Sequence, residues 1–121
     1  MKGRVLLIDD SKGIQDSFSS LLEFKGYNVV TANDGFEGIK KLAENEIDCI
    51  VLDIMMPVAG GFDFLENIKP NAQYSKIPVI VVSGTGEDGA REKALSLGAA
   101  EFFHKPVPPK EIIDTIDLYI Q

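Results

Sequence analysis

The sequence predicts an α/β protein in which an open parallel sheet carries helices on both faces. The observations that predict this fold are a repeated unit, the alternation of strands with helices, and the number of units. A short β-rich apolar run, a loop of Gly, Asp, Ser or Pro, and a stretch with helical spacing recur five times in 121 residues. Strands that alternate with helices favour a parallel sheet, because each helix carries the chain back to the edge where the strand began. Five such units are fewer than the eight that close a barrel, so the sheet stays open.

The first unit joins a strand at 4–8 to a helix that ends near Gly26. Asp10 or Ser11 can cap this helix, because a side-chain oxygen there accepts a hydrogen bond from a free amide of the first turn. Gly26 can adopt the left-handed conformation that follows many helices. Apolar side chains at helical spacing are expected on one face of this helix: Ile14, Phe18, Leu21 and Leu22.

The next two units follow the same plan. A strand at 28–32 leads to a helix opened by Asn33-Asp34, and its expected inward residues are Phe36, Ile39 and Leu42. The third strand, at 48–52, is apolar almost throughout, as expected for a central parallel strand that is covered on both faces. A long loop then leads to a short helix with the apolar residues Phe62, Leu65 and Ile68.

The last two units carry strands at 79–83 and 101–104. The helix between them, at about 90–97, has few large apolar residues and is expected to dock weakly. Pro108-Pro109 can start the final helix, because proline is tolerated in a first turn. The expected inner face of that helix consists of Ile112, Ile113, Ile116, Tyr119 and Ile120.

Length and composition fit one domain that spans residues 1–121, with 45% hydrophobic and 26% charged residues. Among open sheets of five strands, the flavodoxin-like order 2-1-3-4-5 is expected. Its ligand site lies at the carboxyl ends of strands 1 and 3.

The charge balance excludes some classes of partner. Nineteen acidic and twelve basic residues give a net charge of −7, which would repel a nucleic acid backbone. No apolar run approaches the roughly 20 residues that cross a bilayer, and no signal peptide opens the chain. The single cysteine, Cys49, lies in an apolar run and is expected to be buried and unreactive. A cytoplasmic protein fits these features.

Five polar side chains lie at the carboxyl ends of the predicted strands, at the edge where ligands bind. They are Asp9, Asp10, Asp53, Ser83 and Lys105. Three carboxylates from two neighbouring strands would repel one another, and a divalent cation relieves that repulsion. Ligands that are all oxygen, with no His or Cys, favour Mg²⁺.

A nucleophilic carboxylate, Mg²⁺, a hydroxyl and a lysine are the groups that phosphoryl transfer to an aspartate requires. The carboxylate forms an acyl phosphate. The metal, the lysine and the hydroxyl neutralise the phosphoryl oxygens. The sequence therefore predicts a phosphoacceptor site.

Four short motifs in this order resemble the receiver domains of two-component signalling, and in particular the single-domain chemotaxis regulators. They are LLIDDS at 6–11, VLDIMMP at 51–57, VVS at 81–83 and FHKP at 103–106. Each motif alone is weak evidence, but each stands at the end of a predicted strand. The resemblance covers essentially the whole chain.

The resemblance implies a role for each acidic residue. Asp53 would be the phosphoacceptor and Asp10 a direct Mg²⁺ ligand. Asp9 would act mostly through metal-bound water, and the main-chain carbonyl of Met55 would complete the coordination.

The resemblance also implies a switch. Ser83 would move to bond the phosphoryl group, Lys105 would pair with a phosphoryl oxygen, and Phe102 would be the aromatic that rotates inward. These motions would reshape the surface of the fourth helix, fifth strand and fifth helix.

The implied partners are a sensor histidine kinase or phosphotransfer protein as donor, and a downstream protein or a missing output domain as target. A small phosphodonor could replace the kinase. The protein would be a switch with at most self-phosphorylation and self-dephosphorylation, and not an enzyme in the usual sense. Two residues depart from the family pattern: Gly60 replaces a polar residue, and Phe102 lacks the hydroxyl of the commoner tyrosine.

Three other functions are weaker interpretations of the same residues. A haloacid-dehalogenase-type phosphatase ends its first strand in Asp-x-Asp, whereas Asp9 and Asp10 are adjacent here. A flavodoxin would need a hydroxyl-rich loop where Asp9-Asp10 would repel phosphate. A docking module that is never phosphorylated would not need the five polar residues. His104 is expected to point away from Lys105 and to be neither ligand nor catalyst.

Overall fold

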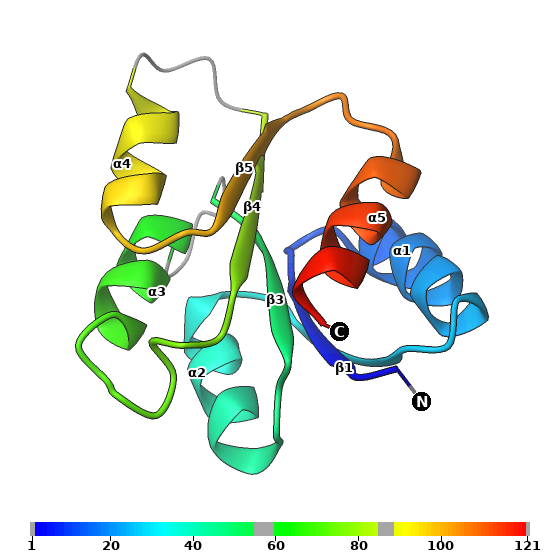
Figure 1. The fold of residues 1–121 in the computed structure, drawn as a ribbon, viewed down its shortest axis with the longest axis horizontal. Coiled ribbons are helices and arrows are strands. Elements are labelled where there is room, and N and C mark those ends of the chain that lie inside the picture. The colour runs from blue at the N-terminus through cyan, green and yellow to red at the C-terminus, as the bar shows by residue number, and fades with distance from the viewer. Residues whose placement is uncertain (1, 55–59, 85–88, 121) are drawn as a thin grey trace.

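A computed structural model describes residues 2–54, 60–84 and 89–120 of the chain. In these residues, five strands and five helices alternate (Figure 1). The strands are β1 (Arg4–Ile8), β2 (Asn28–Ala32), β3 (Cys49–Asp53), β4 (Val79–Ser83) and β5 (Glu101–His104). The helices are α1 (Lys12–Phe24), α2 (Gly35–Glu44), α3 (Gly61–Ile68), α4 (Ala90–Ser96) and α5 (Pro109–Tyr119).

The strands form one sheet in the order β2-β1-β3-β4-β5, and every neighbouring pair is parallel. This order confirms the predicted topology. The register pairs Ile8 with Leu52 and Leu52 with Val81. The carboxyl ends of β1, β3 and β4 therefore meet at one edge of the sheet.

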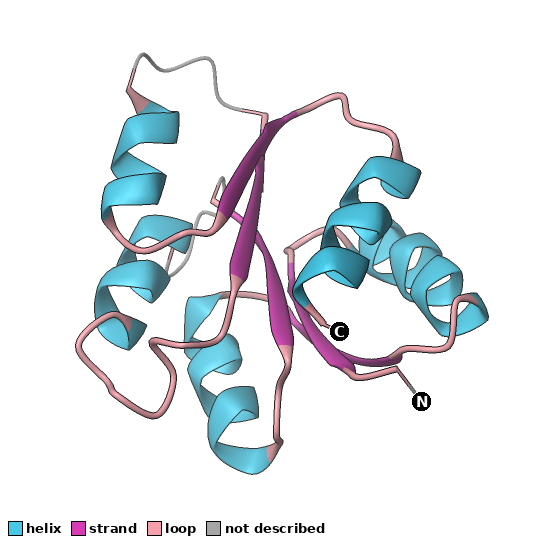
Figure 2. Ribbon diagram, in the orientation of Figure 1, coloured by secondary structure: helices cyan, strands magenta, loops and turns pink. Residues whose placement is uncertain are grey.

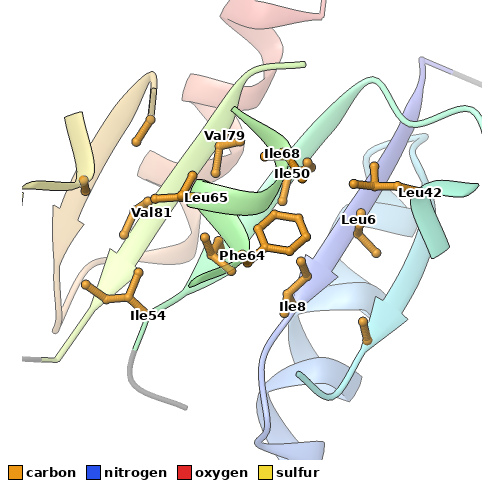
Figure 3. Packing of buried hydrophobic residues seen from close by; sticks show 14 of the residues in the cluster. Leu6, Ile8, Leu42, Ile50, Ile54, Phe64, Leu65, Ile68, Val79 and Val81 are labelled. Atoms are coloured by element: carbon orange, nitrogen blue, oxygen red, sulfur yellow. The ribbon is translucent and has the colours of Figure 1, made fainter. Parts of the chain in front are cut away.

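Helices cover both faces of this sheet. Helices α1 and α5 lie on one face, and α2, α3 and α4 lie on the other (Figures 1 and 2). Alternate residues of each strand supply the two cores: Leu6 and Ile8 face α2 and α3, whereas Val5 and Leu7 face α1 and α5. Figure 3 shows the ring of Phe64 among strand residues of the core that faces α2 and α3.

Three helix ends have the capping residues that the sequence predicts. The Oγ of Ser11 accepts a hydrogen bond from the amide of Ile14 at 3.3 Å, so Ser11 caps α1. Gly26 has a φ of +99°, the left-handed conformation expected after α1. Asp34 caps α2 by accepting from the amide of Glu37 at 2.9 Å.

Gly61 begins α3 where no side chain would fit. A Cβ at this position would lie 2.5 Å from the Cα of Ile54, which is backbone and cannot move aside cheaply. This glycine therefore lets the start of α3 pack against the chain that leaves β3.

Two elements differ from their predicted bounds by one residue. Strand β3 runs from Cys49 to Asp53, not over 48–52, so Asp53 is the last strand residue. Helix α4 ends at Ser96. Its buried residues are only Ala90 and Ala94, in agreement with the predicted lack of large apolar anchors.

Some residues predicted on buried helix faces are exposed. Phe36 is 71% exposed, because α2 packs through Gly35, Gly38 and Leu42, and Phe36 falls off that face. Tyr119 is exposed as well, and its hydroxyl donates to the Glu101 carboxylate at 2.8 Å. The inward predictions for these two residues are wrong.

Ile14 and Leu21 of α1 are exposed to a similar degree and line a groove beside α5, so of the four apolar residues expected on one face of this helix only Phe18 and Leu22 are buried. Cys49 is fully buried as predicted, and burial raises the pKa of its thiol to about 12. Among the described residues, no helix is long and apolar enough to cross a membrane.

Candidate functional site

The carboxyl edge of the sheet gathers the predicted polar residues. Asp9 follows β1, Asp53 ends β3, Ser83 ends β4, and Lys105 follows β5. Asp9, Asp53 and Ser83 are buried, and Asp10 is exposed. Parallel strands place these side chains together because their carboxyl ends all lie at the same edge.

Three carboxylates form an acidic cluster at this edge. Asp9, Asp10 and Asp53 each offer one carboxylate oxygen, and these oxygens lie within 4.8 Å of one another. Oxygen ligands at such separations suit a hard divalent cation such as Mg²⁺. Two members of the cluster are buried and one is exposed, so a cation held there would reach solvent on the Asp10 side.

The electrostatics of Asp9 show the repulsion that a cation would relieve. Burial raises the pKa of the Asp9 carboxyl above its usual 3.8, and the charges of Asp53 and Asp10 raise it further. The Ser11 amide and the Lys105 charge oppose that rise in pKa but do not cancel it. A divalent cation would favour the ionised form of Asp9.

Lys105 supplies the positive charge within the protein. Its Nζ lies 3.6 Å from the Oδ2 of Asp53, and its side chain is 33% exposed. Its amide donates to the carbonyl of Ser83 at 2.7 Å, which fastens the end of β5 to the end of β4. The lysine therefore neutralises part of the Asp53 charge and stays accessible from solvent.

Asp9 is held by its neighbours at three atoms. Its Oδ1 accepts from the Ser11 amide at 2.8 Å, and its own amide donates to the carbonyl of Ala32 at 3.1 Å. Its carbonyl accepts from the Nε2 of Gln15 at 2.5 Å.

Gln15 was not among the residues singled out in the sequence. The signal that could have found it is its place one turn before Phe18 and two before Leu22 on the buried face of α1. A polar residue in an apolar stripe must find hydrogen-bond partners.

A groove of about 580 Å³ adjoins the cluster. It runs between α1 and α5 and is lined mainly by apolar side chains, among them Ile14, Phe18, Leu21 and Ile112. Asp9, Asp53 and Lys105 also line it. Ile14 and Leu21 therefore line the same groove as the polar residues of the site.

Three further residues singled out in the sequence have different outcomes. Phe102 lies in β5, is half-buried, and packs against the core that includes Ala94 of α4. Met55 lies outside the described residues, so its proposed carbonyl ligand stays a prediction. His104 ends β5 with an exposed side chain and is not part of the acidic cluster.

Comparison with known proteins gives one consistent result. A family model described as the response regulator receiver domain matches residues 5–117. The transcriptional regulatory protein CpxR homolog of Haemophilus influenzae is 37% identical over 93% of this chain and 48% of that protein. The response regulator SaeR of Staphylococcus aureus is 37% identical over 90% of this chain and 46% of that protein. The chain thus spans about half the length of these curated relatives.

Solved structures agree with these matches in fold. The chemotaxis protein CheY4 of Vibrio cholerae has a TM-score of 0.89 and 30% identity, covering 97% of this chain and 98% of that one. A CheY-like receiver domain from Methanospirillum hungatei has a TM-score of 0.89 and 29% identity, covering 98% and 93%. With an acidic cluster and a lysine at the carboxyl edge of a 2-1-3-4-5 sheet, the chain belongs to the response regulator receiver domain family of two-component signalling.

Proposed function

We propose that this receiver domain is a phosphorylation-dependent switch that accepts a phosphoryl group on Asp53 in the presence of Mg²⁺. The observation that carries the proposal is the meeting of three carboxylates, with Lys105 Nζ 3.6 Å from Asp53. Such a set serves a reaction in which negative charge gathers on a transferred group.

The acidic cluster has the donor set for the metal. Asp9, Asp10 and Asp53 would hold Mg²⁺, and the carbonyl of Met55 would add a ligand. The bound cation would offset the charge on the phosphoryl oxygens and the nucleophile. By resemblance to receiver domains, Asp10 is the residue proposed to contact the metal directly, and Asp9 is proposed to act mostly through metal-bound water.

Asp53 is the proposed nucleophile. One of its carboxylate oxygens attacks phosphorus, the P–N bond to a donor imidazole breaks, and an acyl phosphate forms. The leaving imidazole takes a proton from solvent. Lys105 is within 3.6 Å of Asp53 and would shift its ion pair from the Asp53 carboxylate to a phosphoryl oxygen.

Ser83 and Phe102 would carry the signal outward. Ser83 lies at the end of β4, level with the site, and its register partner in β5 is His104, two residues after Phe102. Helix α4 is buried only through alanines, so few apolar contacts oppose its movement. The proposed output is a changed surface formed by α4, β5 and α5.

The proposed donor is a sensor histidine kinase, a phosphotransfer protein or a small phosphodonor. The proposed target is a downstream protein or an output domain outside residues 1–121. Two of the relatives are regulators about twice as long as this chain. Self-phosphorylation from a small donor and self-dephosphorylation are the only catalysis proposed.

The test is intact-mass spectrometry after incubation with phosphoramidate. Wild-type protein with Mg²⁺ is expected to gain one phosphoryl group, and protein treated with a chelator is expected to gain none. The Asp53→Asn variant should stay folded and unmodified. A folded, Mg²⁺-bound wild type that gains no phosphoryl group would favour a docking module that is never phosphorylated.

A further inference from the structure

Gln15 is a buried amide that joins three elements next to the acidic cluster. Gln15 is only 4% exposed, because it lies on the buried, mainly apolar face of α1. A buried amide without hydrogen bonds would destabilise the fold, so its position requires partners. Those partners are Asp9, which follows β1, and Ala32 and Asn33, at the end of β2 and just after it.

Both amide hydrogens of Gln15 have good acceptors. Nε2 lies 2.5 Å from the carbonyl oxygen of Asp9 and 2.8 Å from the Oδ1 of Asn33. The carbonyl of Ala32 lies farther away, at 3.4 Å. The two short bonds hold the side chain in one orientation, with an acceptor on each side.

Asn33 is itself held in the orientation that Gln15 needs. Its Nδ2 donates to the Oε2 of Glu37 at 3.0 Å, which leaves Oδ1 to accept from Gln15. Glu37 belongs to the first turn of α2, whose cap is Asp34. A chain of hydrogen bonds therefore runs from the start of α2 through Asn33 and Gln15 to Asp9.

The last bond in this chain acts on the two acidic residues together. The carbonyl of Asp9 belongs to the peptide plane between Asp9 and Asp10, so the bond from Gln15 fixes the tilt of that plane. The tilt sets the direction in which both side chains leave the backbone. Asp9 and Asp10 supply two of the three carboxylate oxygens that lie within 4.8 Å of one another.

We propose that Gln15 is a positioning residue that sets the geometry of the Asp9–Asp10 pair for a divalent cation. It touches neither the cation nor the phosphoryl group, and it acts through the Asp9 carbonyl. Partners of this kind commonly change metal affinity by about tenfold or more when they are removed. The inference rests on the proposed metal-dependent function and adds the residue that prepares its metal site.

The experiment measures Mg²⁺ affinity by calorimetric titration of the unphosphorylated protein. Gln15→Met keeps an unbranched side chain of similar length and removes the amide donor. We expect its Kd for Mg²⁺ to rise about tenfold. With phosphoramidate as donor, half-saturation should need correspondingly more Mg²⁺, whereas the rate at saturating Mg²⁺ should stay near that of the wild type.

A second variant keeps the test valid if Gln15→Met folds poorly. Asn33→Ala leaves Gln15 in place but removes one of its acceptors, at a position that is exposed. We expect a smaller rise in Kd. The double variant should bind Mg²⁺ no more weakly than Gln15→Met alone, because both changes act through the same bond to Asp9.

The control variant is Ile116→Val in α5, which removes a buried methylene far along the chain from the acidic residues. It is expected to lower the thermal midpoint and to leave the Kd for Mg²⁺ unchanged. A loss of affinity in Ile116→Val equal to that in Gln15→Met would show that only stability matters, and would overturn the proposal.

The remaining outcomes separate the two proposals. A folded Gln15→Met or Asn33→Ala that binds Mg²⁺ like the wild type overturns the positioning role, whatever the phosphorylation result. A wild type that binds Mg²⁺ but takes no phosphoryl group overturns the proposed function. In that case, weaker Mg²⁺ binding by Gln15→Met still supports the positioning role.

Discussion

Asp9 is a buried carboxylate that lies close to two others. Burial and the charges of Asp53 and Asp10 raise its pKa above 3.8, while the Ser11 amide and Lys105 favour its ionised form. The same residue is fastened at its amide, its carbonyl and its Oδ1. The surroundings within the protein therefore disfavour the ionised form of Asp9, while three hydrogen bonds hold the residue in place.

The raised pKa has a consequence for stability in metal-free buffer. The folded state keeps the Asp9 proton to a higher pH than the unfolded state does. The contribution of Asp9 to stability therefore falls as pH rises through the window that begins near 3.8, and this loss is complete above the pKa of Asp9 in the folded state. Asp9→Asn removes this titration and can still accept from the Ser11 amide.

We expect Asp9→Asn to be more stable than the wild type at pH 7 with a chelator present, because the disfavoured charge is gone. The gain should disappear below the unfolded pKa of 3.8. Urea unfolding on both sides of that pKa measures both effects. Asp16→Asn, an exposed acid of α1, is the control and should change stability little. A less stable Asp9→Asn at pH 7 would contradict this account of the cluster.

The sequence predicts the bounds of the strands better than the buried faces of the helices. Strands were predicted to within a residue, because apolar runs between turn residues are an unambiguous pattern. Helix faces were predicted less well. Phe36 was expected inside, but α2 packs through two glycines, and spacing alone does not show that a glycine can lie on the buried face. Ile14 and Leu21 fit the helical spacing but border the groove next to α5.

Two glycines allow a test of element packing. Gly61→Ala would place a Cβ 2.5 Å from the Cα of Ile54, so we expect destabilisation of about 1–3 kcal/mol. Gly13 lies in α1, and a Cβ at this position would meet nothing within 4 Å, so Gly13→Ala should stabilise the fold by roughly 0.5–1 kcal/mol. Denaturant unfolding measures the free energy of unfolding of both variants relative to the wild type. Equal effects of the two changes would mean that the contact with Ile54 is relieved by small shifts.

At the scale of the whole molecule, the order of five strands determines the site. The repeated strand–helix unit predicts the parallel sheet, and the sheet brings Asp9, Asp53, Ser83 and Lys105 to one edge. The sequence could therefore indicate both the fold and the main polar residues. For Gln15, the sequence indicates only a place on the apolar face of α1, and its hydrogen-bond partners are shown by the tertiary contacts alone.

In the proposed switch, Asp53 carries the phosphoryl group. Borohydride reduction of the phosphorylated protein converts an acyl phosphate of aspartate to homoserine, and peptide mass spectrometry then locates the modified residue. We expect homoserine at position 53 alone, and only in protein that was phosphorylated in the presence of Mg²⁺. Homoserine at Asp9 or Asp10, with Asp53 unmodified, would contradict the account.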